Sequence, residues 1–301
     1  MGRDMRILVS GSSGLVGRAV SADLSLRGHR VGRLVRGTTS VPGDVLWDPA
    51  AGRFDSGAAE GTDAVVHLAG ENISSRRWTD GQKRRIRDSR IEGTALLARS
   101  LLALPHPPSI VIAASAIGFY GDTGDRAVDE ASPPGTGFLA DVCRAWEAAA
   151  RPLADGGVRL VTLRLGVVLG TRGGALAQML PLFRVGLGGR IGNGRQWMSW
   201  ITLGEVVGIV SFALGNGDLR GPVNAVAPEP VRNSDFTAAL GKALGRPTLL
   251  AVPAIALRLA LGEMADALLL SSSRVSPAVL PRCGYRFTHP ELEGALRSLL
   301  G

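Results

Sequence analysis

Cysteine and histidine are too scarce in this chain of 301 residues to organise it through disulfides or metal ions. The two cysteines, Cys143 and Cys283, are far apart, and the four histidines are scattered singly. Disulfide frameworks and zinc sites need several ligands at characteristic spacings. The sequence therefore argues against a disulfide-stapled fold and predicts no metal-binding residues.

Lysine is nearly absent, although the chain is basic overall. Lysine and arginine together number 34 against 26 acidic residues, yet only Lys83 and Lys242 are lysines. The one dense basic run is Lys83–Arg90, and the chain carries no basic stripe interleaved with aromatic residues. An arginine preference spread over the whole chain indicates a compositional bias, so we expect no nucleic-acid partner.

A long uninterrupted apolar segment is also missing. The most apolar late stretch, Val252–Leu270, is broken by Arg258, Glu263 and Asp266. It is too interrupted for a membrane span, and we interpret it as a buried helix. Residues 1–10 lead directly into an apolar strand, without the apolar core or cleavage site of a signal peptide. We therefore expect a cytoplasmic protein with no membrane partner, and the sequence leaves the oligomeric state open.

Apolar runs alternate with helical patterns over the first 170 residues. The runs are continuously apolar and rich in β-branched residues, which is typical of parallel strands covered on both faces. The alternation predicts an α/β fold with a Rossmann-type, doubly wound parallel sheet. The predicted strands are Arg6–Ser10, Arg30–Val35, Asp44–Trp47, Ala64–Ala69, Ile110–Ala114 and Leu160–Leu165. The predicted helices are Leu15–Arg27, Asp80–Leu102 and Phe138–Asp155.

The composition changes after residue 170, where glycines cluster and mixed elements follow. We predict a cofactor-binding Rossmann domain over residues 1–170 and a smaller C-terminal domain over residues 171–301. This second domain would fold over the carboxyl edge of the sheet, where ligands of open α/β sheets bind. In an alternative that the sequence leaves open, parts of 205–230 return to the first domain.

A GxxGxxG turn joins the first predicted strand to the first predicted helix. The first glycine of such a turn tolerates unusual backbone angles, the middle one lets the backbone approach a pyrophosphate, and the last lets the helix pack closely. The start of the helix offers unpaired N–H groups to the phosphates. A tight turn without a ligand is the alternative. The predicted cofactor contacts in the turn are Gly11, Ser12, Ser13, Gly14, Leu15, Val16 and Gly17.

The end of the second predicted strand indicates the type of dinucleotide. A site that prefers NAD usually has Asp or Glu here for the ribose 2′-hydroxyl, whereas this chain has Val35 followed by Arg36. An arginine close to the hydroxyls of Ser12 and Ser13 suits a 2′-phosphate. The alternative is a solvated arginine in an arginine-rich protein. We predict that the cofactor is NADP(H), contacted by Val35 and Arg36.

Several segments resemble the extended short-chain dehydrogenase/reductase superfamily. More narrowly, the chain resembles the atypical NAD-dependent epimerase/dehydratase-like proteins that carry a C-terminal domain of unknown function. Members of that branch have been described as sugar-nucleotide epimerases and as relatives of a cell-division inhibitor. The segments that carry the resemblance are His67–Ile73, Ser89–Ile91, Ser115–Gly121, Trp146–Glu147, Gly192–Ile201 and Gly221–Pro230.

This resemblance implies further cofactor contacts. Arg90 stands where extended members carry an active-site Asn, on the middle helix facing the cofactor. The end of the fourth predicted strand would pass the adenosine, and the segment after the sixth strand would lie near the nicotinamide. The implied contacts are Leu68, Ala69 and Gly70, then Arg84 and Arg90, then Val167 and Val168.

The catalytic groups of short-chain reductases are present only in part. Those enzymes use a serine, a tyrosine and a lysine four residues after the tyrosine, whose charge lowers the tyrosine pKa. Ser115 stands at the end of the fifth predicted strand, but neither Tyr120 nor Tyr285 has a lysine four residues later. We take Ser115 and Tyr120 as the catalytic candidates. Arg195 and Gln196 line the same pocket or, alternatively, form a structural turn.

Two functions remain open at this point. In the first, the chain is an NADP(H)-dependent oxidoreductase or epimerase-like enzyme that acts on an unidentified small molecule. In the second, it binds NADP(H) without appreciable turnover and acts as a sensor through a protein partner. The missing Tyr-x-x-x-Lys pair is what keeps the second function in view.

Overall fold

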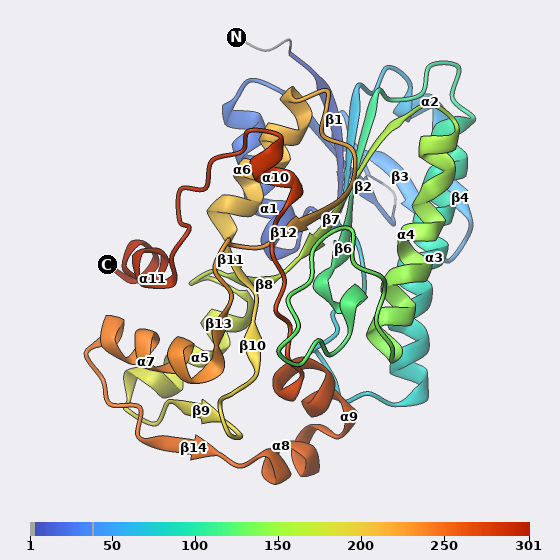
Figure 1. Ribbon diagram of the computed structural model, residues 1–301. Coiled ribbons are helices and arrows are strands. Elements are labelled where there is room, and N and C mark those ends of the chain that lie inside the picture. Colours follow the sequence, from blue (N-terminus) through green and yellow to red (C-terminus); the bar gives the residue numbers. More distant parts are fainter. Residues whose placement is uncertain (1–3, 38) are drawn as a thin grey trace.

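Eight strands form the central sheet of the computed structural model, which describes residues 4–37 and 39–301 (Figure 1). The prediction of no signal peptide concerns residues 1–10, of which residues 1–3 lie outside the described residues. All neighbouring strands are parallel except the edge pair β3 and β4. In spatial order the strands are β12 (Gly221–Ala225), β7 (Arg159–Leu165), β6 (Ile110–Ala116), β5 (Ala64–His67), β1 (Arg6–Ser10), β2 (Arg30–Val35), β3 (Val45–Asp48) and β4 (Arg53–Phe54).

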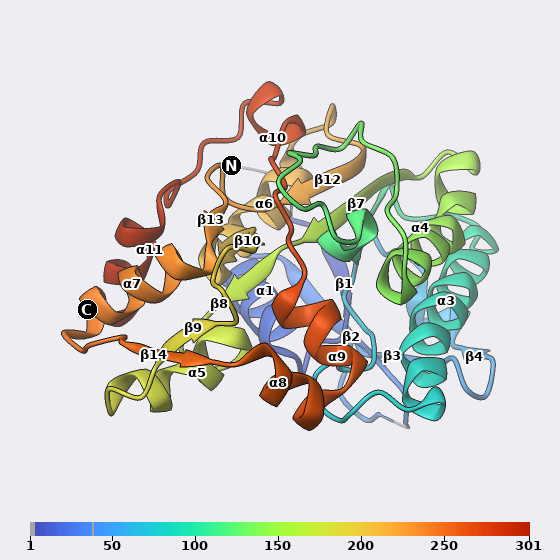
Figure 2. The same cartoon turned by 60° about the horizontal axis from the view of Figure 1, so that its bottom comes forward.

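Residues 167–202 and 226–270 lie at the carboxyl end of the sheet, toward the bottom of Figure 1 and toward the viewer in Figure 2. Three small strand pairs form here. β11 pairs with β8 and β14 with β9 in parallel, and β13 pairs with β10 antiparallel. The strands are β8 (Val167–Leu169), β9 (Gly189–Ile191), β10 (Trp197–Met198), β11 (Trp200–Thr202), β13 (Val231–Arg232) and β14 (Leu250–Val252). The helical segments are α5 (Gly174–Arg184), α7 (Asn233–Leu244), α8 (Ala254–Leu261), α9 (Glu263–Ala265) and η2 (Asp266–Leu270), and α10 (Val279–Arg282) and α11 (Leu292–Leu300) follow them in the chain.

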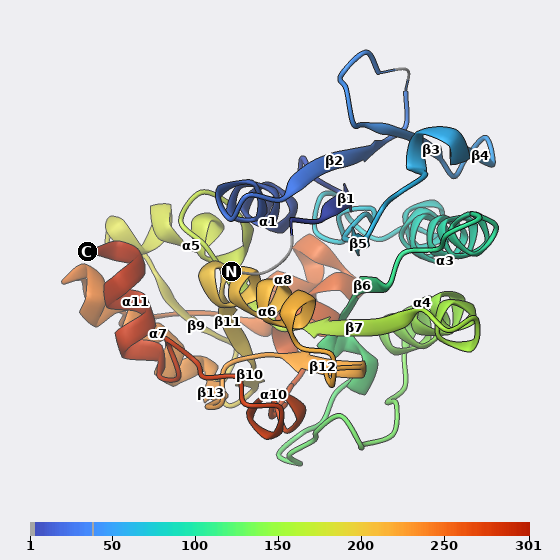
Figure 3. The same cartoon turned by 90° about the horizontal axis from the view of Figure 1, so that it is seen from above.

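Helices cover both faces of the sheet, as its continuously apolar strands require. One face carries α1 (Leu15–Leu26) and α6 (Leu203–Gly215), and the other carries α3 (Asp80–Leu102) and α4 (Phe138–Asp155) (Figure 3). Short segments complete the layers: α2 (Ser56–Ala59) and the 3-10 turn η1 (Ile117–Tyr120). The α/β class and the doubly wound parallel sheet predicted from the sequence are confirmed.

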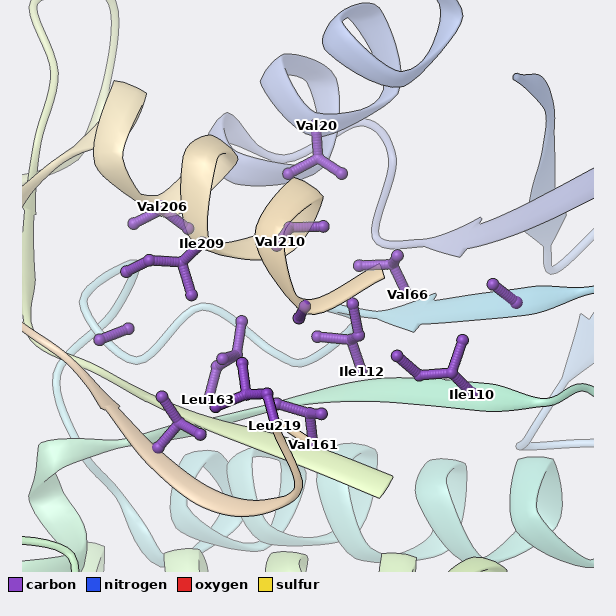
Figure 4. Close-up of a cluster of buried hydrophobic side chains, with 14 of the residues drawn as sticks. Val20, Val66, Ile110, Ile112, Val161, Leu163, Val206, Ile209, Val210 and Leu219 are labelled. Carbon is purple, nitrogen blue, oxygen red and sulfur yellow. The ribbon is translucent and has the colours of Figure 1, made fainter. Parts of the chain in front are cut away.

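The largest core cluster lies between the sheet and the α1–α6 layer (Figure 4). Aliphatic side chains of α6 meet those of the central strands, and Val20 of α1 closes the same layer. Most of α6 and all of β12 lie within residues 205–230; α6 packs on the sheet, and β12 pairs with β7. The division into domains over residues 1–170 and 171–301, with or without the return of parts of 205–230 to the first domain, stays a prediction. The residues labelled in the figure are Val20, Val66, Ile110, Ile112, Val161, Leu163, Val206, Ile209, Val210 and Leu219.

One prediction about the C-terminal part was wrong. The stretch Val252–Leu270 is not one buried helix: it contains the end of β14, then α8, α9 and η2, and α8 has no buried residue. Pro253 sets the start of α8, and Gly262, with a φ of 64°, ends it. Apolar composition predicted burial, but no other segment of the described chain covers the outer side of α8, where Ile255 and Leu259 are exposed.

Candidate cofactor site and active site

The glycine-rich turn is built from close backbone contacts. Gly11 has a φ of 66°, and a Cβ there would lie 2.8 Å from the carbonyl group of Leu68. A Cβ on Gly17 would lie 2.2 Å from the Gly11 carbonyl oxygen. Gly14 is the N-cap of α1 and supplies no side chain to bond the first-turn N–H groups. These donors are therefore free to meet an anion, as a pyrophosphate site needs.

A buried hydroxyl fixes the backbone beside this turn. Ser10, the last residue of β1, accepts hydrogen bonds from the backbone N–H groups of Leu68 and Ala69 at 3.0 and 3.1 Å. Its Oγ lies 2.7 Å from Nδ1 of His67, the last residue of β5. Both lone pairs of the hydroxyl are in use, so its proton points to His67 Nδ1. The ends of β1 and β5 are thereby held together at the point where the strand order reverses.

The same histidine links the strand ends to the helices. With Nδ1 accepting from serine, the ring proton sits on Nε2 and donates to Thr94 Oγ1 at 2.9 Å. Trp146 Nε1 donates to the same oxygen at 2.9 Å, which brings α4 into the chain of hydrogen bonds. Burial lowers the pKa of His67 from 6.5 to about 4, so the ring is neutral at physiological pH.

Arg36 lies just beyond the end of β2. The parallel register pairs Ser10 with Leu34, so Val35 and Arg36 extend past the end of β1 toward the glycine-rich turn. Arg36 is exposed, and no carboxylate of the described chain lies within ion-pair distance of it. Its charge is therefore available to an anionic group at this edge.

Arg90 is a largely buried cation at the same edge. Its Nη1 donates to the carbonyl oxygens of Glu71 and Ile86 at 3.0 and 3.1 Å, and the guanidinium stacks 5.0 Å from the Trp146 ring. A Cβ on Gly70 would lie 3.2 Å from its Cζ. Burial lowers the pKa of Arg90, and within the described residues no carboxylate pairs with it. A buried charge without a counter-ion is costly, so the site favours an anionic ligand.

The other implied cofactor contacts divide between two places. Val167 and Val168 follow β7 directly, are half-buried and pair with β11, so they lie beside the carboxyl ends of the central strands. Arg84, by contrast, lies in a groove of about 560 Å³ between α3 and α4, together with Arg87 and Asp141. The structure thus brings the two valines to the sheet edge and leaves Arg84 in the groove between the two helices.

The far rim of the site joins α3 to the C-terminal region. Lys83 donates to Glu263 of α9 at 2.8 Å and lies 4.7 Å from the ring of Phe138. Met264 packs beside Trp78 in a small apolar cluster at the start of α3. Phe138 itself stacks edge-on against Trp78. The first two residues of α4, Phe138 and Leu139, are apolar, and they stand where short-chain reductases carry a catalytic tyrosine.

The comparisons with known proteins agree with this architecture. The sequence model of the NAD dependent epimerase/dehydratase family matches residues 7–225. The chain belongs to this epimerase/dehydratase family. A domain of unknown function, DUF1731, matches residues 252–299. The family resemblance drawn from the sequence, including the added C-terminal domain, is confirmed.

Relatives of this family member align over nearly its full length. The epimerase family protein Mb2239 of Mycobacterium bovis is 46% identical over 290 residues, which cover 96% of each chain. The crystal structure of human epimerase family protein SDR39U1 with NADPH is 36% identical and has a TM-score of 0.90, covering 98% of this chain and 99% of the human one. A nucleoside-diphosphate sugar epimerase of Corynebacterium glutamicum is 37% identical with a TM-score of 0.82, and this chain spans 59% of it.

In this epimerase/dehydratase family member, both catalytic candidates belong to one buried polar network. Ser115 Oγ donates to Glu147 at 2.7 Å, and Glu147 accepts two hydrogen bonds from Arg164 at 2.9 Å. Arg164 Nη1 donates to the Tyr120 hydroxyl at 2.8 Å, and that hydroxyl donates to Asn224 at 2.7 Å. Burial raises the pKa of Tyr120, although the charge of Arg164 partly opposes the rise. Ser115 is 2% exposed and Tyr120 is 1% exposed, so both hydroxyls are internally satisfied.

Sequence reasoning missed the two charged members of this network. Glu147 lies on α4, one turn beyond Cys143. Cys143 is buried, and burial raises the pKa of its thiol to about 11. Arg164 stands opposite Ser115 in the β6–β7 register. A usable signal was present, since a charged residue in an otherwise apolar central strand needs a buried partner. Of the other two candidates, Gln196 donates to backbone carbonyl groups, which suits the structural turn, and Arg195 is exposed.

Proposed function

We propose that this family member binds NADP(H) across the carboxyl edge of the sheet, at the junction of β1 and β5. The observation that carries the proposal is the backbone cradle of Gly11, Gly14 and Gly17, with the unpaired Arg36 beside it. The cradle would hold the pyrophosphate and Arg36 the 2′-phosphate. The crystal structure of the 36% identical human relative with NADPH supports the same cofactor.

On this basis we infer an oxidoreductase- or epimerase-like activity on a small molecule. The nicotinamide, when bound, would supply or accept a hydride. Leu68, Ala69 and Gly70 would flank the adenosine side, Val167 and Val168 the nicotinamide side, and Arg90 would offset negative charge. Ser115 and Tyr120 remain the proposed catalytic residues, and the expected location is the cytoplasm. No helix among the described residues is long and apolar enough to cross a membrane.

The alternative function, a sensor with little or no turnover, also has a specific observation in its favour. The hydroxyls of Ser115 and Tyr120 are both bonded within the protein, so neither is open to a substrate in this conformation. The test is a screen of carbonyl compounds and nucleotide sugars for NADPH oxidation. Tight NADPH binding without oxidation would favour the sensor. A pull-down in which the amount of captured partner differs between NADPH and NADP⁺ would support it.

Cofactor choice tests the binding proposal directly. A charge-assisted contact to the 2′-phosphate contributes roughly 1.5–3 kcal/mol, so Arg36→Asp should weaken NADPH binding by roughly 10- to 150-fold or more. Fluorescence titration with NADPH and NADH measures both affinities. Arg151→Asp is the control, because Arg151 is also an exposed arginine but lies near the end of α4, where it pairs with Asp155 at 3.9 Å. Equal affinity of the natural protein for NADPH and NADH would contradict the proposal.

A further inference from the structure

Exposed apolar side chains gather in one region of the molecule. Ten large apolar side chains are exposed among the described residues, and eight of them fall within residues 182–187 and 249–259. Isolated exposed apolar residues are ordinary, but a concentration of this kind marks an interaction surface. The eight are Leu182, Val185, Leu187, Leu249, Leu250, Val252, Ile255 and Leu259.

The two stretches form one continuous surface. β9 pairs with β14 in parallel, with Arg190 opposite Ala251, and Gly186 lies against Pro247. α8 then follows β14 directly through Pro253. In Figures 1 and 2, α5, β9, β14 and α8 lie along the same edge of the molecule. The end of α5 and the whole of α8 therefore flank one small sheet.

The two stretches that form this surface carry no acidic residue, although Asp266 pairs with Arg258 of α8. The chain has no Asp or Glu between Asp155 and Glu205, and none between Asp235 and Glu263. Among the described residues, Arg184, Arg190 and Arg246 have no ion-pair partner. The "apolar–basic face" is defined by the eight apolar residues and these three exposed arginines.

We propose that the apolar–basic face docks on the surface of a lipid bilayer that contains anionic lipids. Ile255 and Leu259 are one turn apart on α8, which is the pattern of helices that lie in a membrane interface. Leu182 in the last turn of α5 and Val185, the C-cap of that helix, extend the apolar side. The three arginines complement anionic headgroups, and no carboxylate of these segments opposes them. A second copy docked on the same face would bring like charges together.

This inference replaces the expectation of no membrane partner. That expectation rested on reading residues 252–270 as a buried helix, whereas α8 is exposed. The contact proposed is peripheral, since no helix of the described chain can span a bilayer. It is independent of the proposed cofactor site, because none of its residues belongs to the glycine-rich turn or the ends of β1 and β5.

Sedimentation with lipid vesicles tests the proposal on the full chain. We expect binding to vesicles of phosphatidylcholine with phosphatidylglycerol, little binding to phosphatidylcholine alone, and release at high salt. Replacing Arg184 and Arg246 by Glu should lower the partition coefficient by at least roughly 25-fold. Leu249→Ser and Ile255→Ser should each lower it roughly tenfold.

The control is Leu26→Ser at the end of α1. Leu26 is 88% exposed and Leu249 is 91% exposed, so the two substitutions are matched in chemistry and exposure and neither should disturb folding. The control should bind anionic vesicles as the natural protein does. The proposal is overturned by absence of binding to anionic vesicles, or by equal losses in the control. It is equally overturned by a stable dimer in sedimentation velocity that Leu249→Ser dissociates, since a second copy would then cover the face.

Discussion

His67 should make the stability of this protein fall as the pH is lowered toward 5. Its pKa is about 4 in the folded chain because the ring is buried, against 6.5 in the unfolded chain. A depressed pKa means that the unfolded state binds the proton first as the pH falls. The stabilisation is therefore fully present above the unfolded pKa and is lost between about pH 6.5 and about pH 4.

The size of the effect follows from the two pKa values. Each unit corresponds to 1.36 kcal/mol, so the full difference amounts to roughly 3 kcal/mol, of which about 2 kcal/mol is lost by about pH 5. Protonation would also place a second hydrogen between Nδ1 and Ser10, whose hydroxyl already accepts two backbone N–H groups. The loss should thus be felt at the strand ends that border the proposed cofactor site.

Urea denaturation between about pH 8 and about pH 5 measures this loss. His67→Asn should be less stable than the natural protein at neutral pH, because the hydrogen-bond chain is broken, but its stability should depend less on pH. His106→Asn is the control: the His106 side chain is 87% exposed, and its removal should leave the pH dependence unchanged. If His67→Asn kept the full dependence, the buried neutral histidine would not be its source.

The remaining predictions concern the glycine-rich turn and the polar network. Gly14→Val should abolish NADPH binding, because the side chain would fill the space through which the pyrophosphate approaches. The circular dichroism spectrum should be retained, because the Gly14 φ of −74° suits any residue. Undiminished NADPH binding would identify a turn without a ligand. Tyr120→Phe should lower the free energy of unfolding by about 1–3 kcal/mol, since Arg164 loses an acceptor. If a substrate is found and Tyr120 is the acid, kcat should also fall roughly 10²–10⁴-fold with NADPH affinity unchanged, whereas an unchanged kcat would remove that role. Glu147→Gln should cost about 3–5 kcal/mol in urea denaturation by leaving Arg164 without its counter-ion, and a loss below about 1 kcal/mol would contradict the ion-pair assignment.

The elements of the Rossmann half were predictable because their signals are local. α3 and α4 begin and end at the predicted residues, and Thr79 caps α3 by accepting from the Gln82 N–H. β1 and β2 also have the predicted bounds, since each is a short run rich in aliphatic residues that is bounded by a turn. The turn signal likewise located the backbone turn, whose contact between Gly17 and Gly11 lies within the motif, although the contact of Gly11 with Leu68 does not.

The features that the sequence did not reveal depend on contacts between residues that are far apart in the chain. The partnership of Ser115 with Glu147 and Arg164 arises from the β6–β7 register and from the face of α4 that meets it, neither of which local patterning specifies. Apolar content likewise could not tell a covered helix from an uncovered one, as α8 shows. Whether a hydrophobic segment is buried is decided by what else packs on it, and that is a property of the tertiary structure.

The rim at the start of α3 has a consequence for the order in which the protein assembles. Lys83 and Glu263 are 180 residues apart, so this contact cannot form until nearly the whole chain has left the ribosome. Until then Trp78 lacks the cover of Met264, and the nascent Rossmann half carries an apolar surface that invites non-native association. Closing so long a loop is entropically slow. A chain truncated after residue 251 should therefore retain the sheet's own strands but aggregate more readily than the full-length protein.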